Sequence, residues 1–146
     1  MSKPTGPSFE TTIHVRDHCM CLHVQRAARA LARRFDEALK PVGLTNQQFS
    51  LLMSLNRPEP PRMKEVALLL ALDRTTLTAN LKPLERRGLV IVSPDPGDKR
   101  SRRLALTDEG RALLVEALPH WVRTELEIEK DVSDPDLMRH NLMALS

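Results

Sequence analysis

"LDRTTLTANLKPLERRGLV", residues 72–90, is the stretch of sequence that decides the fold class. Leu77, Leu81 and Leu84 recur at i, i+4 and i+7, which predicts a helix with one apolar stripe. Asp73 is a good N-cap residue for this helix. With the stripe turned inward, the outward half of the helix carries Thr75, Thr78, Ala79, Lys82 and Arg86.

The hydrophobic period changes after Gly88. "LVIVS" and "RRLALT" are β-type runs, and the "PDPGDKRS" between them is rich in turn residues, which predicts a hairpin with a charged tip. Upstream, "GLTNQQFSLLMSL" and "MKEVALLLAL" predict two shorter helices, and Thr45 with Gln48 forms a capping box for the first. The order helix, short helix, turn, helix, hairpin is that of a winged helix-turn-helix.

The outward half of the helix after Asp73 suits contact with duplex DNA. Threonine and alanine are small enough for a helix to approach base edges closely, and threonine adds a hydroxyl and a methyl group that bases can contact. Lys82 and Arg86 are long enough to reach the flanking backbone. The alternative is an ordinary solvated helix face. The basic run Lys99–Arg103 on the hairpin that follows favours the DNA interpretation.

Composition and charge agree with one soluble domain. The chain has 146 residues, of which 41% are hydrophobic and 28% charged. Its longest apolar run, Val66–Leu72, is too short to span a membrane, and the N-terminus lacks the hydrophobic block of a signal peptide, so we expect a cytoplasmic protein. Residues 1–107 carry 18 basic against 10 acidic side chains, whereas residues 108–146 carry 4 against 9. This asymmetry fits a polyanion-binding body, although ordinary surface charge is an alternative.

"LDRTTLTANLKPLERRGLV" and "PDPGDKRSRRLALTDEG" together resemble the core of the MarR family of bacterial winged-helix transcriptional regulators. The resemblance extends over nearly the whole chain and includes "GLTNQQFSLLMSL". It implies a homodimer held by N- and C-terminal helices and bound to a pseudo-palindromic operator. Many members release DNA when a small molecule, often phenolic, or an oxidant acts on the protein.

The resemblance also implies roles for residues of the hairpin and the helix. Arg100 matches the wing arginine that enters the minor groove, and Asp98 matches the acid that orients it or its neighbours, unless Asp98 is only a turn residue. A guanidinium on a narrow hairpin tip independently suits the potential of the minor groove. Lys99 and Arg102 are expected to contact phosphates. The start of the recognition helix carries Arg74, Thr75, Thr76 and Thr78.

The predicted fold is mainly α with a small β-hairpin wing, a winged helix-turn-helix with N- and C-terminal dimerisation helices. We expect a flexible lead-in over residues 1–16, a dimerisation helix over 17–44, the DNA-binding domain over 45–107 and C-terminal dimerisation helices over 108–146. The terminal helices carry more apolar surface than a small winged-helix core needs, and a second copy would cover it. Packing within one subunit is the less favoured alternative.

Both cysteines and three histidines lie in "HVRDHCMCLH", residues 14–23. Cys19 and His23, at i and i+4, could hold a metal, but the paired clusters of a structural zinc site are missing. On one continuous helix, Cys19 and Cys21 would point to nearly opposite sides, which disfavours a disulfide. Cys21 matches the place of the peroxidatic cysteine in the organic-hydroperoxide sensors of the family, but the chain has no tyrosine to hold a thiolate, and Phe35 and Asn46 stand where we expect those tyrosines. A buried packing cysteine is therefore favoured at this position.

The sequence offers two alternatives to a DNA-binding regulator. An enzyme built on Cys19 or Cys21 with a nearby histidine lacks a third catalytic member and a Gly-rich oxyanion loop. A winged helix that only binds other proteins does not need the basic wing. We therefore predict a sequence-specific regulator, a repressor released by a small organic effector, with no enzymatic activity, no cofactor, no metal and no membrane partner. The alternative function is a thiol-based organic peroxide sensor that uses Cys21.

Overall fold

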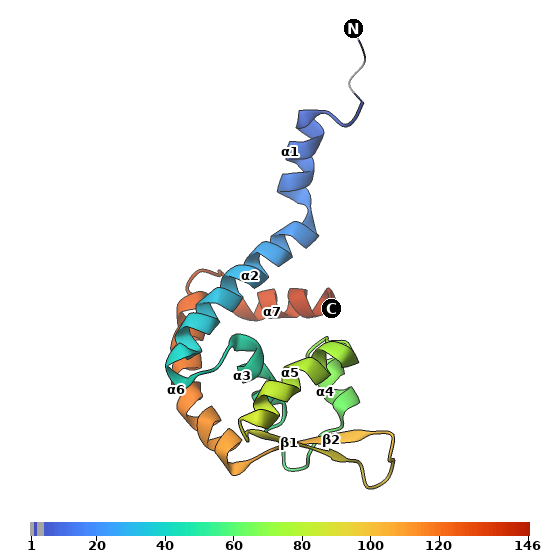
Figure 1. Ribbon diagram of the computed structural model, residues 1–146. Helices are drawn as coiled ribbons and strands as arrows, with labels where there is room; N and C mark the ends of the chain where they lie inside the picture. Colours follow the sequence, from blue (N-terminus) through green and yellow to red (C-terminus); the bar gives the residue numbers. More distant parts are fainter. Residues whose placement is uncertain (1, 3–4) are drawn as a thin grey trace. The chain divides into compact units, whose positions relative to one another are not determined.

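The computed structural model describes residue 2 and residues 5–146. These residues form two compact units, an N-terminal unit that ends at Arg34 and a C-terminal unit, Phe35–Ser146. It is mainly helical with one antiparallel hairpin, as the sequence predicts (Figure 1). The elements are α1 Phe9–His18, α2 Met20–Leu39, a short 3-10 turn Lys40–Val42, α3 Asn46–Ser54, α4 Met63–Leu69, α5 Arg74–Arg86, β1 Val90–Pro94, β2 Arg102–Leu106, α6 Asp108–Glu129 and α7 Pro135–Ala144.

The N-terminal unit begins with a helix that the sequence did not predict. The flexible lead-in predicted over residues 1–16 is wrong in its second half, because α1 starts at Phe9. The Ser8 side chain accepts a hydrogen bond from the Thr11 backbone N–H at 3.2 Å and so acts as an N-cap. Three residues of the predicted lead-in lie outside the described residues: Met1, Lys3 and Pro4.

Cys19 separates α1 from α2. Its backbone is extended, with φ −69° and ψ 108°, so the single long helix predicted from Asp17 onward is in fact two helices. Asp17 belongs to the end of α1, and Met20 begins α2.

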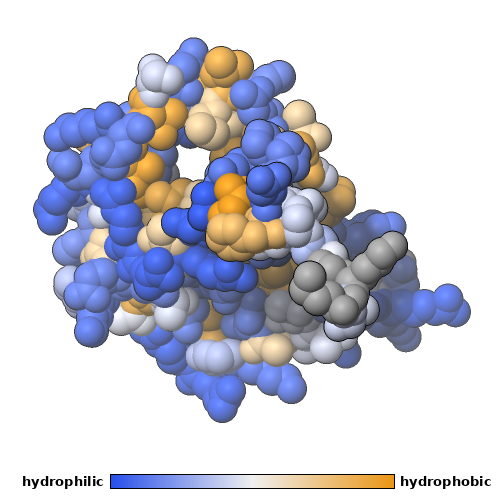
Figure 2. All heavy atoms as spheres, turned by 90° about the horizontal axis from the view of Figure 1, so that it is seen from above, coloured by the Kyte–Doolittle hydropathy of each residue, from blue (hydrophilic) through white to orange (hydrophobic). Residues whose placement is uncertain are grey.

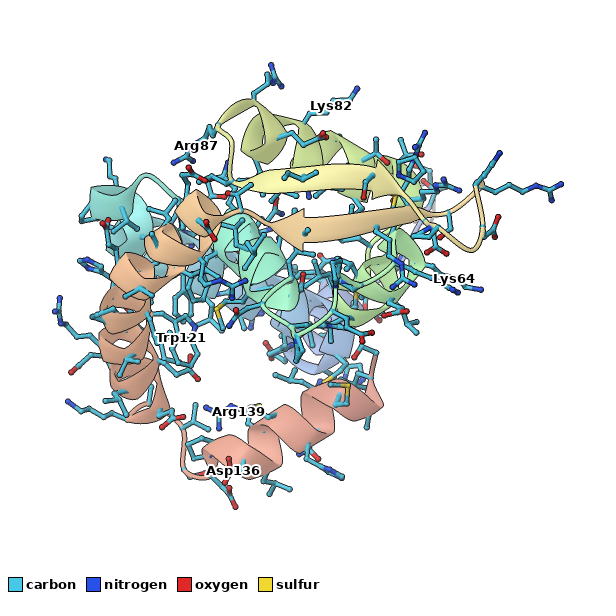
Figure 3. The ribbon with its side chains drawn as sticks, turned by 90° about the horizontal axis from the view of Figure 1, so that it is seen from below. Lys64, Lys82, Arg87, Trp121, Asp136 and Arg139 are labelled. Carbon is cyan, nitrogen blue, oxygen red and sulfur yellow. The ribbon has the colours of Figure 1, made fainter. Side chains whose placement is uncertain are left out.

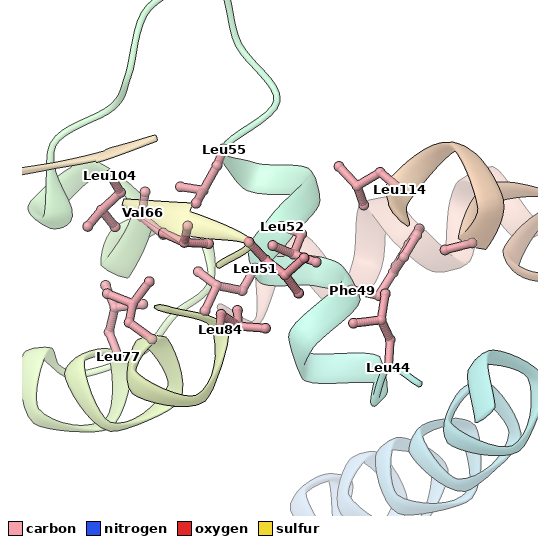
Figure 4. Close-up of a cluster of buried hydrophobic side chains, with 14 of the residues drawn as sticks. Leu44, Phe49, Leu51, Leu52, Leu55, Val66, Leu77, Leu84, Leu104 and Leu114 are labelled. Atoms are coloured by element: carbon pink, nitrogen blue, oxygen red, sulfur yellow. The ribbon is translucent and has the colours of Figure 1, made fainter. Parts of the chain in front are cut away.

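The hydrophobic core of the C-terminal unit lies between α3, α4, α5 and the hairpin (Figure 4). Leu52, Val66, Leu77 and Leu84 are all 0% exposed there. The Thr45–Gln48 capping box predicted for α3 is present, with its two hydrogen bonds at 3.2 and 3.0 Å. The core side chains pack α4 and α5, the two helices of the helix-turn-helix, against α3 and the hairpin.

The hairpin pairs β1 with β2 in the register Val90↔Leu106 to Pro94↔Arg102. Its inner face contributes Leu104, which is fully buried. The outer edge of β2 is not free, because the Leu104 N–H donates to the Pro61 carbonyl at 3.0 Å and Arg62 forms a β-bridge with Arg103. The "RPEPPR" segment between α3 and α4 therefore holds the hairpin from outside.

Two further helices follow the hairpin. Thr107 caps α6, and its side chain accepts a hydrogen bond from the Gly110 N–H at 3.0 Å, as the sequence predicts. Trp121 of α6 stacks on Phe49 of α3 with 6.4 Å between the ring centroids. Arg139 of α7 forms ion pairs with Glu125 and Glu129 of α6 and with Asp136, so α7 is tied to α6 by charge rather than by buried residues. No helix within the described part of the chain is long and apolar enough to cross a membrane.

Candidate DNA-binding interface

α5 presents the face that the sequence predicts. Its leucine stripe, Leu77, Leu81 and Leu84, is at most 1% exposed. The opposite side is open to solvent along the whole helix. The exposed residues on it are Arg74, Thr75, Thr76, Thr78, Ala79, Lys82 and Arg86.

The N-terminus of α5 is held by Asp73. The Asp73 carboxylate accepts hydrogen bonds from the Thr76 backbone N–H at 2.7 Å and from the Thr76 hydroxyl at 2.9 Å. These bonds stabilise the charged form, and they hold the pKa of Asp73 below its usual value. The cap satisfies one of the free N–H groups of the first turn and fixes where the exposed face begins.

The three threonines of α5 differ in what their hydroxyls do. The Thr76 hydroxyl serves the cap, and the Thr78 hydroxyl donates to the Arg74 carbonyl at 2.8 Å. Thr75 is exposed and makes no side-chain hydrogen bond to any other described residue. Thr75 is therefore the threonine best able to offer its hydroxyl to a ligand.

The C-terminal end of α5 carries three basic side chains with different partners. The Arg86 Nε donates to the Lys82 carbonyl at 3.4 Å, and the Lys82 side chain is exposed. Arg87, which the sequence analysis did not single out, donates from Nη1 to the Gly43 carbonyl at 2.9 Å. Gly43 has a φ of +70°, which favours glycine, and it ends the 3-10 turn before α3. Arg87 thus connects the end of α5 to the turn before α3.

The wing tip is ordered by its own hydrogen bonds. The Asp98 Oδ1 accepts from the Arg100 backbone N–H at 3.0 Å, and the Ser101 N–H donates to the Asp98 carbonyl at 3.0 Å. Asp98 is therefore a turn residue that accepts a hydrogen bond from the backbone of Arg100, and a role in orienting the Arg100 side chain stays a prediction. The Lys99, Arg100 and Arg102 side chains at this tip are exposed.

The start of α4, the start of α5 and the wing tip surround one cleft. Four basic side chains line it, together with Met63, Ala67, Asp98 and Ser101: Lys64, Arg74, Arg100 and Arg102. In Figure 3, Lys64 and Lys82 lie on opposite sides of the hairpin and both point outward. Sequence reasoning predicted Arg74, Arg100 and Arg102 but missed Lys64. The available indication was its place in the first turn of the short helix before the recognition helix.

Sequence reasoning also missed Asp95, which it treated only as part of the hairpin turn. Its side chain is 2% exposed and lies between Arg62 and Arg103. Arg103, although it belongs to the basic run of the wing, is thus bound to Asp95, and its side chain is only 29% exposed. No sequence pattern separates Arg103 from its exposed neighbour Arg102.

The cysteines lie in the N-terminal unit. Cys21 is exposed, and its sulfur accepts a hydrogen bond from Gln25 Nε2 at 3.4 Å, so the favoured prediction of a buried packing cysteine is wrong for this chain. Cys19 lies in the break between α1 and α2, so the geometric argument against a Cys19–Cys21 disulfide, which assumed one helix, does not apply. Within the described residues, no three His, Cys, Asp or Glu side chains are grouped to hold a metal.

Large apolar side chains are exposed on the terminal helices. α6 exposes Val115, Leu118, Val122 and Leu126, and α7 exposes Leu137, Met138, Leu142 and Met143. In the N-terminal unit, Phe9, Met20 and Val24 are also exposed. Figure 2 shows hydrophobic side chains gathered in patches on the visible face. Exposed apolar patches on a soluble domain mark surfaces that another molecule covers.

Comparisons with known proteins agree with this geometry. The MarR family model matches residues 44–101. The regulator TtmR of Methylorubrum extorquens is 38% identical over 108 residues, a match that covers 73% of this chain and 55% of TtmR. The structure of the transcriptional regulator MosR of M. tuberculosis in complex with DNA has a TM-score of 0.81 and 40% identity, and the match covers 88% of this chain and 93% of MosR. The repressor CouR bound to a 23-mer DNA duplex has a TM-score of 0.71 and 31% identity, with 86% and 89% covered. CouR of Rhodococcus jostii RHA1 has also been solved with p-coumaroyl-CoA.

A helix-turn-helix with an exposed recognition face, followed by a basic hairpin, defines a winged helix-turn-helix DNA-binding protein. The chain belongs to the MarR family: the family model matches residues 44–101, and the chain covers most of the regulators MosR and CouR at 40% and 31% identity. It is a DNA-binding transcriptional regulator, and both the predicted fold class and the family resemblance are confirmed.

Proposed function

We propose that this regulator is a repressor that binds a pseudo-palindromic operator as a homodimer and releases it when a small organic molecule binds. The observation that carries the proposal is the convergence of basic side chains from α4, α5 and the wing on one cleft beside the exposed face of α5. Such a cluster favours the phosphates of duplex DNA. CouR, a related repressor solved on DNA, supports the sign of the regulation. Binding without catalytic turnover is sufficient for this role, and a chromosomal target requires it to act in the cytoplasm.

The contacts divide between the two grooves of the duplex. In this proposal the α5 face enters the major groove, where Thr75, Thr78 and Ala79 meet base edges. Arg100 enters the neighbouring minor groove, oriented by Asp98. The remaining predicted side chains contact the backbone or the ends of the site: Arg74, Thr76, Lys82, Arg86, Lys99 and Arg102. Lys64 joins them, since it lines the same cleft as Arg74 and Arg100.

Homodimerisation is supported by the exposed apolar side chains of the terminal helices. Leu126 of α6 and Leu137 of α7 are 56% and 51% exposed, and Met20 of α2 is 63% exposed. A second copy that covered such surfaces would gain about 25 cal/mol for each Å² of apolar area removed from water. Two-fold symmetry in the protein would then match the two half-sites of a palindromic operator.

The effector site in this proposal is an apolar cleft between α3, the end of α4 and α6. It is lined by Phe49, Ser50, Met53, Ser54, Leu69, Leu70, Leu118 and Trp121. The cleft contains no charged side chain, and Trp121 offers an aromatic face and one N–H donor. A ligand with an apolar, aromatic body fits this lining. Because α3 and α4 also support α5, such a ligand could change the position of the recognition helix. CouR, bound to p-coumaroyl-CoA in one structure, supports regulation by an organic ligand.

One observation favours a second candidate, a peroxide sensor that uses Cys21. Its sulfur is accessible, as a peroxidatic cysteine must be. The hydrogen bond that its sulfur accepts comes from the neutral Gln25 amide and not from a cation. The organic ligand therefore stays the favoured effector.

The test begins with an operator selected from random duplex DNA. Arg100→Ala should weaken operator binding by about 1–3 kcal/mol in fluorescence anisotropy, with the fold and the dimer intact. Arg123→Ala is the matched control, because it removes the same charge from α6 at an exposed position away from the wing. If Arg100→Ala binds the operator as tightly as Arg123→Ala does, the wing is not part of the interface.

A further inference from the structure

A buried carboxylate lies at the foot of the wing. Asp95 follows the last residue of β1 and is 2% exposed, whereas the tip residues Pro96 to Arg100 are all exposed. An ionised carboxylate in a buried place must be compensated by charges or hydrogen bonds, because desolvation otherwise makes it costly. A negative charge near a DNA-binding surface repels the phosphates of DNA, so the partners of Asp95 indicate what else this acid does.

Two arginines from different segments hold this carboxylate. The Arg103 Nε of β2 donates to Oδ1 at 2.8 Å, and the Arg62 Nε lies 3.4 Å from Oδ2. Oδ2 accepts no hydrogen bond from any described residue, so its contact with Arg62 is an ion pair only. Arg103 also donates from Nη1 to the Pro60 carbonyl at 2.8 Å. The carboxylate thus connects both strands of the wing with the segment before α4.

The charged form of Asp95 is the stable one. The hydrogen bond from Arg103, with the charges of Arg103 and Arg62, lowers the pKa of Asp95 in spite of its burial, and the same bond raises the pKa of Arg103. The contact is therefore fully formed near neutral pH.

The backbone of Asp95 closes the wing tip. Its N–H donates to the Ser101 carbonyl at 2.9 Å, and its carbonyl accepts from the Asp98 N–H at 3.3 Å. Asp98 in turn accepts from the Arg100 N–H. A continuous series of contacts therefore runs from Arg62, outside the hairpin, through Asp95 and Asp98 to Arg100.

We propose that Asp95 is a positioning residue for DNA binding, which clamps the wing to the segment before α4 and so sets where Arg100 meets the minor groove. The inference rests on the proposed function, in which Arg100 contacts DNA. It also assigns Arg62 and Arg103 to the clamp rather than to the nucleic acid, although both lie in basic segments.

The sign of the effect separates this role from simple electrostatics. Asp95→Asn removes a negative charge close to a polyanion site, and charge alone would make DNA binding tighter. Loss of the clamp would make it weaker. Glu65→Gln is the matched control, because Glu65 is a neighbouring carboxylate that is 51% exposed and forms its ion pair with Arg57. Its removal takes away a negative charge that acts on Arg103 without removing a contact of Asp95.

The experiment is a double-mutant cycle on the selected operator. Operator affinity is measured for Asp95→Asn, Arg100→Ala and the double variant in the full chain, with thermal melting to confirm folding. We expect Asp95→Asn to weaken binding on the order of tenfold, comparable with the loss of one specifying arginine. Glu65→Gln should bind at least as tightly as the parent. In the Arg100→Ala background, the effect of Asp95→Asn should fall to about twofold or less, because the clamp acts through Arg100.

Arg103→Lys provides a second variant if Asp95→Asn does not fold. It keeps the charge, but one ammonium group cannot hold both Asp95 and the Pro60 carbonyl in the geometry of the guanidinium. It should therefore also weaken binding in the parent and have little effect beside Arg100→Ala. Asp95→Asn or Arg103→Lys with parental affinity, beside a weakened Arg100→Ala, would overturn the inference while leaving the proposed function intact. Equal losses with and without Arg100 would also overturn it. An Arg100→Ala protein with parental affinity would instead refute the wing contact itself and, with it, the clamp.

Discussion

Gly110→Ala is a substitution for which helix propensity and packing predict opposite signs. Gly110 lies in the first turn of α6. Alanine is favoured over glycine in a helix by up to about 1 kcal/mol, the value for a helix interior. A Cβ built on Gly110, however, would lie 2.3 Å from the Leu89 carbonyl oxygen and 3.1 Å from Leu106 Cδ2. Carbon and oxygen atoms that are not covalently linked normally stay about 3.3 Å or more apart. The backbone would therefore have to move by about 1 Å.

The movement is costly because the blocking atom belongs to the backbone. The Leu89 carbonyl accepts a hydrogen bond from the Thr107 N–H at 3.1 Å, and it lies directly before β1. Overpacking of this kind costs about 3 kcal/mol at the upper end of the usual range. After subtraction of the helix gain, the expected net destabilisation is about 2 kcal/mol. For a chain of this length, that corresponds to a fall in Tm of about 4–8 °C.

Thermal melting by circular dichroism at fixed protein concentration measures this effect, since the stability of a dimer depends on concentration. Gly97→Ala is the matched control: its Cβ would lie 3.9 Å from Asp95 Oδ2, an ordinary contact, and we expect a Tm close to that of the parent. A Gly110→Ala protein with an equal or higher Tm would show that the junction between the hairpin and α6 can adjust, and would refute the packing argument.

Three further predictions concern the turn before α5, the α5 face and the effector. Ala71 has a φ of +53°, a backbone conformation that disfavours branched side chains. Ala71→Val should therefore lower the stability by about 1–2 kcal/mol in thermal melting, while Ala71→Gly should not. Equal stability of the two variants would contradict strain in this turn. Thr75→Ala should change the preferred base at one position of each half-site in selection from random DNA. Thr76→Ala should keep the preference, because the Thr76 hydroxyl bonds the Asp73 cap. An unchanged motif in Thr75→Ala would show that another face reads the DNA. Organic hydroperoxide should not release DNA from the parent protein, and micromolar release that disappears in Cys21→Ser would make the thiol the sensor instead.

The sequence by itself determined the order and type of the elements in the C-terminal unit. The Leu77–Leu81–Leu84 stripe defines the buried face of α5 and, by exclusion, the outward face. Such patterns depend on neighbours within one or two turns, so a local rule of period is enough to find them. The caps at Thr45, Asp73 and Thr107 are equally local, since each bonds a backbone N–H three residues later.

The N-terminal unit shows where local rules failed. α1 begins in a segment whose Pro, Gly, Ser and Thr content predicts a flexible lead-in. That prediction fails because it counts residue types over the whole segment and so overlooks the single N-cap at Ser8. The break at Cys19 interrupts a pattern that reads as one continuous helix. Cys21 is exposed, and the period of one helix does not say which of its faces is covered.

Only the tertiary structure decided which basic side chains of the wing region are available. Arg102 and Arg103 are adjacent in the sequence, yet Arg103 is bound to Asp95, while Arg102 lines the cleft with Lys64. Adjacent residues of β2 point to opposite sides of the hairpin. Which of the two arginines meets the buried carboxylate depends on where Asp95 and the segment before α4 pack against the wing. Contacts between segments that are far apart in the chain depend on how the elements pack, and the period of a single element carries no information about them.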